Sequence, residues 1–228
     1  MGTRQSVTQM NDPEHVTLRE IAERTGADKL KHKYESHYET HLGPWRESRI
    51  RLLEIGVKRG ASLAMWEQYF PLADIFGLDI EPACRRYETD RSKIFVGDQE
   101  DPACLRTVMA QIGQPLDVVI DDGGHTMKQQ RTSFETLFEY VRPGGLYIVE
   151  DTHTSYRDTH GGGAPGTADT FIMLLKGLLD DLHFRVLRKQ GYADRFPVSA
   201  VHAYPKICFI VKGDHLVATD VNAQMASR

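Results

Sequence analysis

The sequence predicts an α/β fold with a doubly wound, mostly parallel sheet of seven strands. Short apolar runs alternate with helical segments between residues 51 and 179, a spacing typical of crossover connections between parallel strands. Acidic residues follow several of these runs, where an open sheet binds its ligands. The last two apolar runs have no helix between them, which indicates a C-terminal antiparallel hairpin at the edge of a Rossmann-like sheet.

Each element is expected from its local pattern. A polar helix is expected first, at roughly Thr17–Thr25. Continuous apolar runs are typical of buried parallel strands, and these are expected at Arg51–Ile55, Ile75–Ile80, Lys93–Val96, Leu116–Asp121 and Gly145–Glu150. The helices that alternate with them are expected at Ala61–Tyr69, Pro82–Tyr87, Pro102–Gln111, Met127–Tyr140 and Ala168–Leu179. The hairpin strands are expected at His183–Arg188 and Lys206–Val211.

The length of 228 residues suits one α/β domain with a short extension. We expect loose tails at 1–13 and 216–228, an N-terminal helical cap segment at 14–45 and a catalytic domain at 46–215. The net charge of -4 favours neither nucleic acid nor an anionic membrane as a partner. No apolar run approaches a membrane span, and no signal peptide is recognised. Three widely spaced cysteines indicate free thiols and a cytoplasmic location.

Two expected strands end in clusters of acidic residues. Asp121 and Asp122 follow the fourth strand with His125 close behind, and Glu150 and Asp151 follow the fifth. Neighbouring parallel strands bring such ends to one crevice. Carboxylates bind hard metal ions, and a histidine beside them suits a general base. The alternative is that these residues only cap helices, but their occurrence at two successive strand ends favours a site.

A glycine turn follows the first expected strand. Gly56 and Gly60 allow a ligand to approach the backbone closely, but their spacing differs from that of dinucleotide-binding loops. Glu54 at the loop entrance would oppose a pyrophosphate and would suit a cationic ligand. S-adenosylmethionine, which carries a sulfonium and an ammonium group, is such a ligand.

Polar residues also end the next two strands. Asp79 lies 25 residues after Glu54, near the spacing at which an acid meets a ribose diol. Asp98 and Gln99 follow the third strand and are placed to meet an adenine. Each of these acids alone could be a helix cap, whereas the ordered set favours a nucleoside.

At this point the chain resembles the class I S-adenosylmethionine-dependent methyltransferases. More narrowly, it is similar to the Mg²⁺-dependent sugar O-methyltransferases of the mycinamicin and rhamnosyl type over about residues 25 to 212. The segments that carry the resemblance are Asp28-Lys29, residues 53–57 and 60–63, residues 76–80 and 97–99, residues 121–125 and 142–147, Glu150-Asp151 and residues 154–156.

The resemblance implies functional residues. By it, Asp122, Glu150 and Asp151 bind Mg²⁺, and His125 is the general base. The residues that it places in the S-adenosylmethionine pocket are Glu54, Gly56, Asp79, Gln99 and Asp121. The resemblance also implies a homo-oligomer and a small-molecule or oligosaccharide acceptor.

The chain departs from the family pattern at Gly124, where serine is frequent, and at His153. It is expected to lack the long N-terminal domain of the macrolide-sugar enzymes. Its length is closer to that of single-domain saccharide methyltransferases, including the mycobacterial methylmannose polysaccharide enzymes.

Further histidines and tyrosines have less specific patterns. His153 and Tyr156 either cover the acceptor or lie in a solvated loop. His32, His37 and His41 are interpreted as surface or cofactor-lid residues and not as metal ligands. Three alternatives to sugar methylation stay open: a Mg²⁺-dependent catechol-type O-methyltransferase, another enzyme class on this fold such as a nicotinamide-dependent enzyme, and a non-catalytic cofactor-binding subunit.

Overall fold

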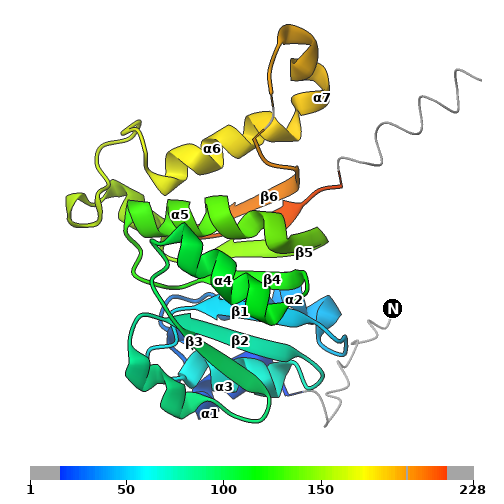
Figure 1. Ribbon diagram of the computed structural model, residues 1–228, viewed down its shortest axis with the longest axis vertical. Helices are drawn as coiled ribbons and strands as arrows, with labels where there is room; N and C mark the ends of the chain where they lie inside the picture. The colour runs from blue at the N-terminus through cyan, green and yellow to red at the C-terminus, as the bar shows by residue number, and fades with distance from the viewer. Residues whose placement is uncertain (1–15, 194, 215–228) are drawn as a thin grey trace, which may run out of the picture.

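The computed structural model describes residues 16–193 and 195–214 and shows a single sheet with helices on both faces (Figure 1). The strands are β1 (Arg51–Ile55), β2 (Asp74–Asp79), β3 (Ser92–Val96), β4 (Leu116–Asp121), β5 (Val141–Val149), β6 (Val198–Tyr204) and β7 (Ile207–Lys212). Their order across the sheet is β3-β2-β1-β4-β5-β7-β6. Strands β1 to β5 are parallel, and β7 is antiparallel to β5 and β6. The predicted fold class is confirmed.

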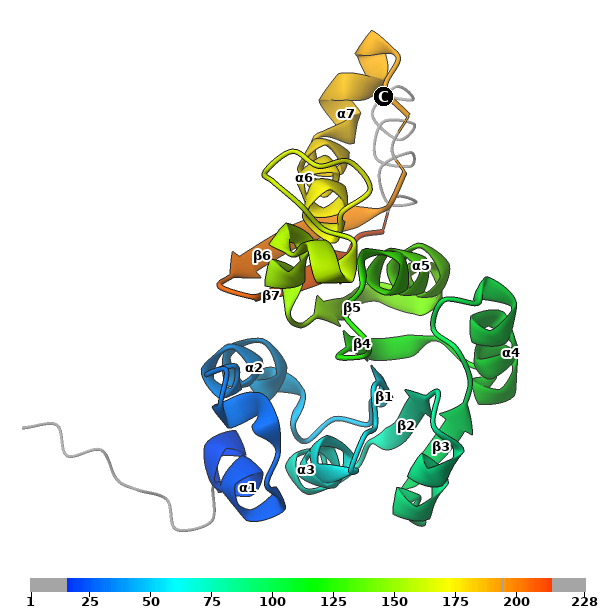
Figure 2. The ribbon, with the colours of Figure 1, turned by 90° about the vertical axis from the view of Figure 1, so that its left-hand side faces the viewer.

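Helices form a layer on each face. The α-helices are α1 (Leu18–Thr25), α2 (Glu35–Leu42), α3 (Ala61–Tyr69), α4 (Pro102–Ile112), α5 (Met127–Leu137), α6 (Phe171–Leu182) and α7 (Phe184–Leu187). The 3-10 turns are η1 (Asp28–Leu30), η2 (Gly43–Trp45), η3 (Pro82–Tyr87), η4 (Phe138–Tyr140), η5 (Thr152–Tyr156), η6 (Asp158–His160) and η7 (Arg188–Gln190). Figure 2 shows α1, α2 and α3 on one side of the sheet and α4 and α5 on the other. The helix expected at Pro82–Tyr87 is a 3-10 helix over the same residues.

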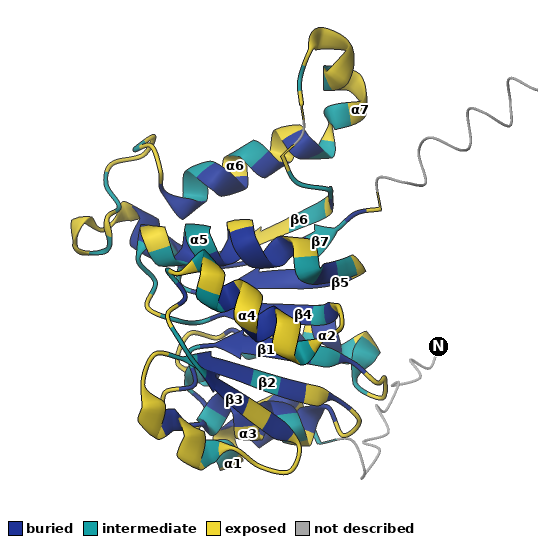
Figure 3. Ribbon diagram, in the orientation of Figure 1, coloured by how far each residue is buried: buried dark blue, intermediate teal, exposed yellow. Residues whose placement is uncertain are grey.

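The N-terminal segment is part of the core. Helix α1 begins at a capping box in which the Thr17 side chain accepts from the Glu20 amide. Tyr34, Tyr38 and Leu42 are buried in the same cluster as residues of α3 and of one sheet face. Figure 3 shows the strands largely buried between the two helical layers. The segment therefore packs on one face of the sheet, together with α3.

One predicted strand is wrong. His183–Arg188 contains helix α7 and the start of η7, and Val186 is 63 % exposed. A short alternation of apolar residues does not distinguish a strand from a helical turn. The first hairpin strand is β6, which pairs with β7 through the register Tyr204↔Ile207. The two residues between them form the turn, where Lys206 has a φ of 71°.

The two predicted tails, at 1–13 and 216–228, lie outside the described residues. Within 16–193 and 195–214, no helix has both the length and the apolar character needed to cross a membrane.

Candidate active site

The sheet order reverses between β1 and β4, and a cavity of about 770 Å³ opens at the carboxyl ends of the strands. The predicted site residues that line it are Gly56, Asp79, Asp98, Gln99, Asp122, His125, Glu150 and Asp151. The predicted residues outside its lining are Glu54, Gly60, Asp121, His153 and Tyr156. The fold thus brings residues that follow five different strands to one crevice.

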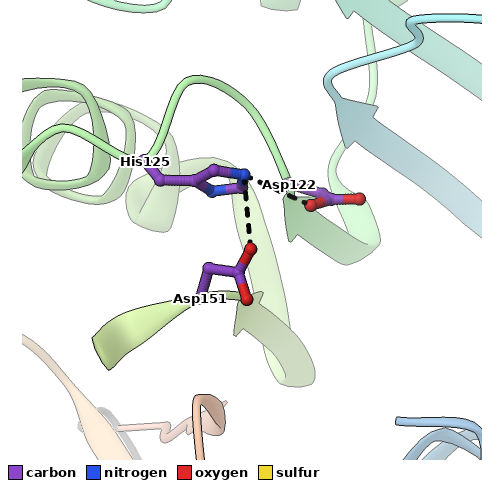
Figure 4. Close-up of side chains that lie close together, drawn as sticks. All are labelled: Asp122, His125 and Asp151. Carbon is purple, nitrogen blue, oxygen red and sulfur yellow. Dashed lines mark ion pairs between the residues drawn. The ribbon is translucent and has the colours of Figure 1, made fainter. Parts of the chain in front are cut away.

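Asp122, His125 and Asp151 converge at one end of this cavity (Figure 4). His125 Nε2 lies 3.7 Å from Asp122 Oδ1 and 3.6 Å from Asp151 Oδ2. One ligand atom from each residue lies within 4.8 Å of the other two, a spacing that could hold a metal ion. The φ angles of His125 and Asp151 are 58° and 52°. Such backbone strain is common at functional sites, where surrounding structure holds it.

Glu150, the third predicted metal ligand, is held by two side chains of the N-terminal segment. Its Oε1 accepts a 2.5 Å hydrogen bond from Tyr38 Oη and lies 2.6 Å from Lys29 Nζ. Burial and the neighbouring carboxylate of Asp122 raise the pKa of Glu150 well above its usual range, although Lys29 opposes the shift. Glu150 nonetheless lines the cavity.

Lys29 is a site residue that sequence reasoning missed. It is fully buried, and its Nζ lies 2.5 Å from Asp122 Oδ2 and 3.3 Å from Glu54 Oε1, in addition to its contact with Glu150. Burial opposes its charge, but the carboxylates around it raise the pKa of Lys29 well above its ordinary value. The sequence signal was the Asp28-Lys29 pair, which resembles a solvated polar turn when read alone.

The two glycines of the first loop have different roles. Gly56 has a φ of 93°, and a Cβ there would lie 2.1 Å from the Asp122 carbonyl oxygen. Gly60 is the left-handed N-cap of α3, and a Cβ there would lie 2.7 Å from the Tyr87 side chain. Gly56 therefore permits the close approach of the two loops that form the site, and Gly60 permits packing behind it.

Glu54 is paired within the protein. It is fully buried, and its Oε2 accepts a 2.6 Å hydrogen bond from Ser62 Oγ. Burial raises the pKa of Glu54, and Lys29 opposes that shift. The carboxylate therefore joins the first turn of α3 to Lys29 in this structure.

Asp79 fixes the backbone of the same loop. Its Oδ2 accepts 2.8 Å hydrogen bonds from the amides of Val57 and Lys58, and its Oδ1 accepts from the Glu81 amide. Burial opposes its charge, but these backbone hydrogen bonds hold the pKa of Asp79 below its usual value. A negative charge is thus maintained at the cavity wall.

Gln99 links the third strand end to the fourth. Its Oε1 accepts from the Gly124 amide at 2.9 Å, and its Nε2 donates to Asp121 Oδ1 at 3.2 Å. Asp121 is fully buried, which raises its pKa. Asp121 therefore orients Gln99, while Asp98 lies beside it on the cavity wall.

The remaining candidates lie around the site. His153 Nδ1 is 3.8 Å from Asp151 Oδ1, and burial lowers the pKa of His153. Tyr156 is 47 % exposed. His32 lines the cavity, whereas the rings of His37 and His41 pack against Tyr204.

Comparison with known proteins finds methyltransferases. Residues 53–152 match a family model described as a methyltransferase domain. The chain is 43% identical over 196 residues to demethylmacrocin O-methyltransferase of Streptomyces fradiae. The aligned region covers 80% of this chain and 49% of that enzyme. It is 39% identical to mycinamicin VI 2''-O-methyltransferase of Micromonospora griseorubida, over 80% of this chain and 48% of the enzyme.

Solved structures give the same result. The MycE methyltransferase from the mycinamycin biosynthetic pathway, in complex with Mg and SAH, superposes with a TM-score of 0.82 at 34% identity. The match covers 89% of this chain and 55% of that one. This chain spans about half the length of the curated relatives that it matches. The matched domain, the sheet order and the structural similarity together show that residues 53–152 form a methyltransferase domain on a Rossmann-like sheet and that the chain is similar to sugar O-methyltransferases.

Proposed function

We propose that this chain transfers a methyl group from S-adenosylmethionine to a sugar hydroxyl, with Mg²⁺ at the acceptor and His125 as general base. The observation that carries the proposal is one cavity that joins the glycine loop and Asp79 to the cluster of Asp122, His125 and Asp151. The O-methyltransferase names of the relatives and the Mg and SAH in the MycE complexes support it.

The residues present fit both groups. Asp122, Glu150 and Asp151 supply carboxylate oxygens, which hard cations such as Mg²⁺ prefer. Gly56 lines the cavity and lets its loop approach the Asp122 backbone closely, and Asp79 supplies a carboxylate on the same cavity wall. A nucleoside with a cationic sulfur is compatible with this acidic crevice.

In the proposed mechanism, one end of the cavity holds the metal and the general base, and the other end binds the cofactor. When bound, S-adenosylmethionine supplies an activated methyl group, and Mg²⁺ lowers the pKa of the acceptor hydroxyl. Asp122, Glu150 and Asp151 would hold the metal. His125 Nε2 faces Asp122 and Asp151 and would accept the hydroxyl proton there. Asp79 would orient the cofactor relative to the acceptor.

The acceptor belongs to the proposal as well. The relatives are named for macrolide and rhamnosyl tetracenomycin substrates, so we propose a sugar of a glycosylated natural product, with a mannose oligosaccharide as the alternative saccharide. A cytoplasmic location and a homo-oligomeric state, both expected from the sequence, stay predictions.

The test is mass spectrometry of an acceptor panel incubated with the protein and S-adenosylmethionine, in the presence of Mg²⁺ or of EDTA. The panel holds macrolide glycosides, rhamnosides, mannose oligosaccharides and a catechol. We expect one methyl group to be added to a sugar in the samples that contain Mg²⁺, and none to be added in the samples that contain EDTA. Methylation that persists in EDTA would contradict the metal assignment, and methylation of the catechol alone would contradict the sugar acceptor.

A further inference from the structure

Lys29 has no role in the mechanism above, yet it lies at the centre of the acidic cluster. It comes from η1 in the N-terminal segment and is fully buried. A buried ammonium is costly unless it is paired and hydrogen-bonded. Here three carboxylates, those of Asp122, Glu150 and Glu54, lie within 3.3 Å of Nζ.

Lys29 contacts only one of the two oxygens of the Asp122 carboxylate. Oδ2 contacts Lys29 Nζ, and Oδ1 is the atom that lies 3.7 Å from His125 Nε2. Lys29 thus holds one oxygen and leaves the other beside the histidine. Glu150 is held in a similar way, because both Lys29 and Tyr38 contact its Oε1 while the residue still lines the cavity.

The same residue joins the N-terminal segment to the site. Asp28, Lys31 and His32 line the cavity on either side of Lys29 in the chain. The Lys29 backbone is held as well, since its carbonyl accepts from the Tyr34 amide at 3.0 Å. One buried side chain therefore fixes both the strand ends and a wall of the cavity.

We infer that Lys29 is a positioning residue of the metal site: its ammonium holds one oxygen of Asp122 and one of Glu150 and leaves the other oxygen of each for the metal. The inference rests on the proposed function, because it concerns the metal that the function requires. Partners that orient metal ligands are worth roughly 10- to 100-fold in metal affinity.

A counter-ion role makes the opposite prediction. If Lys29 only balanced charge, its removal would free carboxylate oxygens and take away a positive charge near the metal. Metal binding would then be unchanged or tighter. The direction of the change in affinity therefore separates positioning from charge balance.

The experiment measures Mn²⁺ binding to the full chain by electron paramagnetic resonance, and stability by thermal melting monitored by circular dichroism. Lys29→Met removes the ammonium and keeps the chain length. The double variant Lys29→Met/Glu54→Gln also removes one of the carboxylates left unpaired, which protects the fold. Lys176→Met, an exposed substitution on α6, is the matched control.

We expect the double variant to stay folded at the temperature of the binding measurement and to bind Mn²⁺ at least about 10-fold more weakly. The control should bind like the wild type. A folded double variant with wild-type or tighter Mn²⁺ affinity would overturn the inference. Failure of the wild type itself to bind Mn²⁺ would instead overturn the metal site of the proposed function, and the role of Lys29 with it.

Discussion

The substitution Gly56→Ala tests how closely the loop after β1 and the loop after β4 must approach each other. The added methyl group has two costs. A non-glycine residue at a φ of 93° is strained by about 1–3 kcal/mol. The Cβ would also lie 2.1 Å from the Asp122 carbonyl oxygen, and overpacking of this kind costs about 1–3 kcal/mol. Together these terms predict a loss of about 2–6 kcal/mol, or a fall in Tm of roughly 4–24 °C.

The clash also predicts a loss of function, because relief of the overlap must move the Asp122 backbone. A ligand displaced by about 1 Å costs on the order of 10²-fold in rate. Gly166→Ala is the matched control, since Gly166 has a φ of 95° and no neighbour within 4 Å of the added Cβ. The assay compares Tm, Mn²⁺ affinity and turnover of the two variants. Equal losses of Tm, Mn²⁺ affinity and turnover in the two variants would refute the reasoning, because backbone strain without a clash would then explain the whole effect of Gly56→Ala.

The remaining predictions concern the base, the cofactor wall and a thiol. His125→Ala should lower turnover by roughly 10²- to 10⁴-fold and leave S-adenosylhomocysteine affinity within a few-fold; near wild-type turnover would exclude His125 as the base. Asp79→Asn should weaken S-adenosylhomocysteine binding by about 10-fold in calorimetry, because a charged acceptor is lost, and an unchanged affinity would remove Asp79 from the cofactor site. Burial and Asp79 raise the pKa of the Cys84 thiol to about 11. The reactive thiolate of Cys84 is therefore scarce at pH 8, and its alkylation rate, followed by peptide mass spectrometry, should rise close to tenfold per pH unit up to pH 10; a flat profile would contradict this.

Much of the fold was predictable because its signals are local. Continuous apolar runs and the glycine turn define β1, β4 and α3, whose bounds match the predicted ones. Strand β6 was missed because it is an edge strand with small and polar residues, and its pairing with β7 is a tertiary contact. The turn at Pro205-Lys206 was the available signal.

The site was predictable to the extent that strand ends define it. Asp122, His125, Glu150 and Asp151 were predicted to lie together because parallel strands place their carboxyl ends together, and all four line one cavity. Lys29 was missed because its partners lie at least 25 residues away in the chain, and only folding reveals its burial. The contact between Glu54 and Lys29 could not be read from the sequence for the same reason, and the cofactor-binding role of Glu54 stays a prediction.

The most direct test of the central claim is the position of a metal and a nucleoside in one crystal. Crystals grown with S-adenosylhomocysteine and Mn²⁺ would be measured for anomalous scattering. We predict one Mn²⁺ peak bonded to Asp122, Glu150 and Asp151, with the nucleoside beside Asp79 in the same cavity. A metal bound elsewhere on the chain, or a nucleoside outside the cavity, would contradict the account.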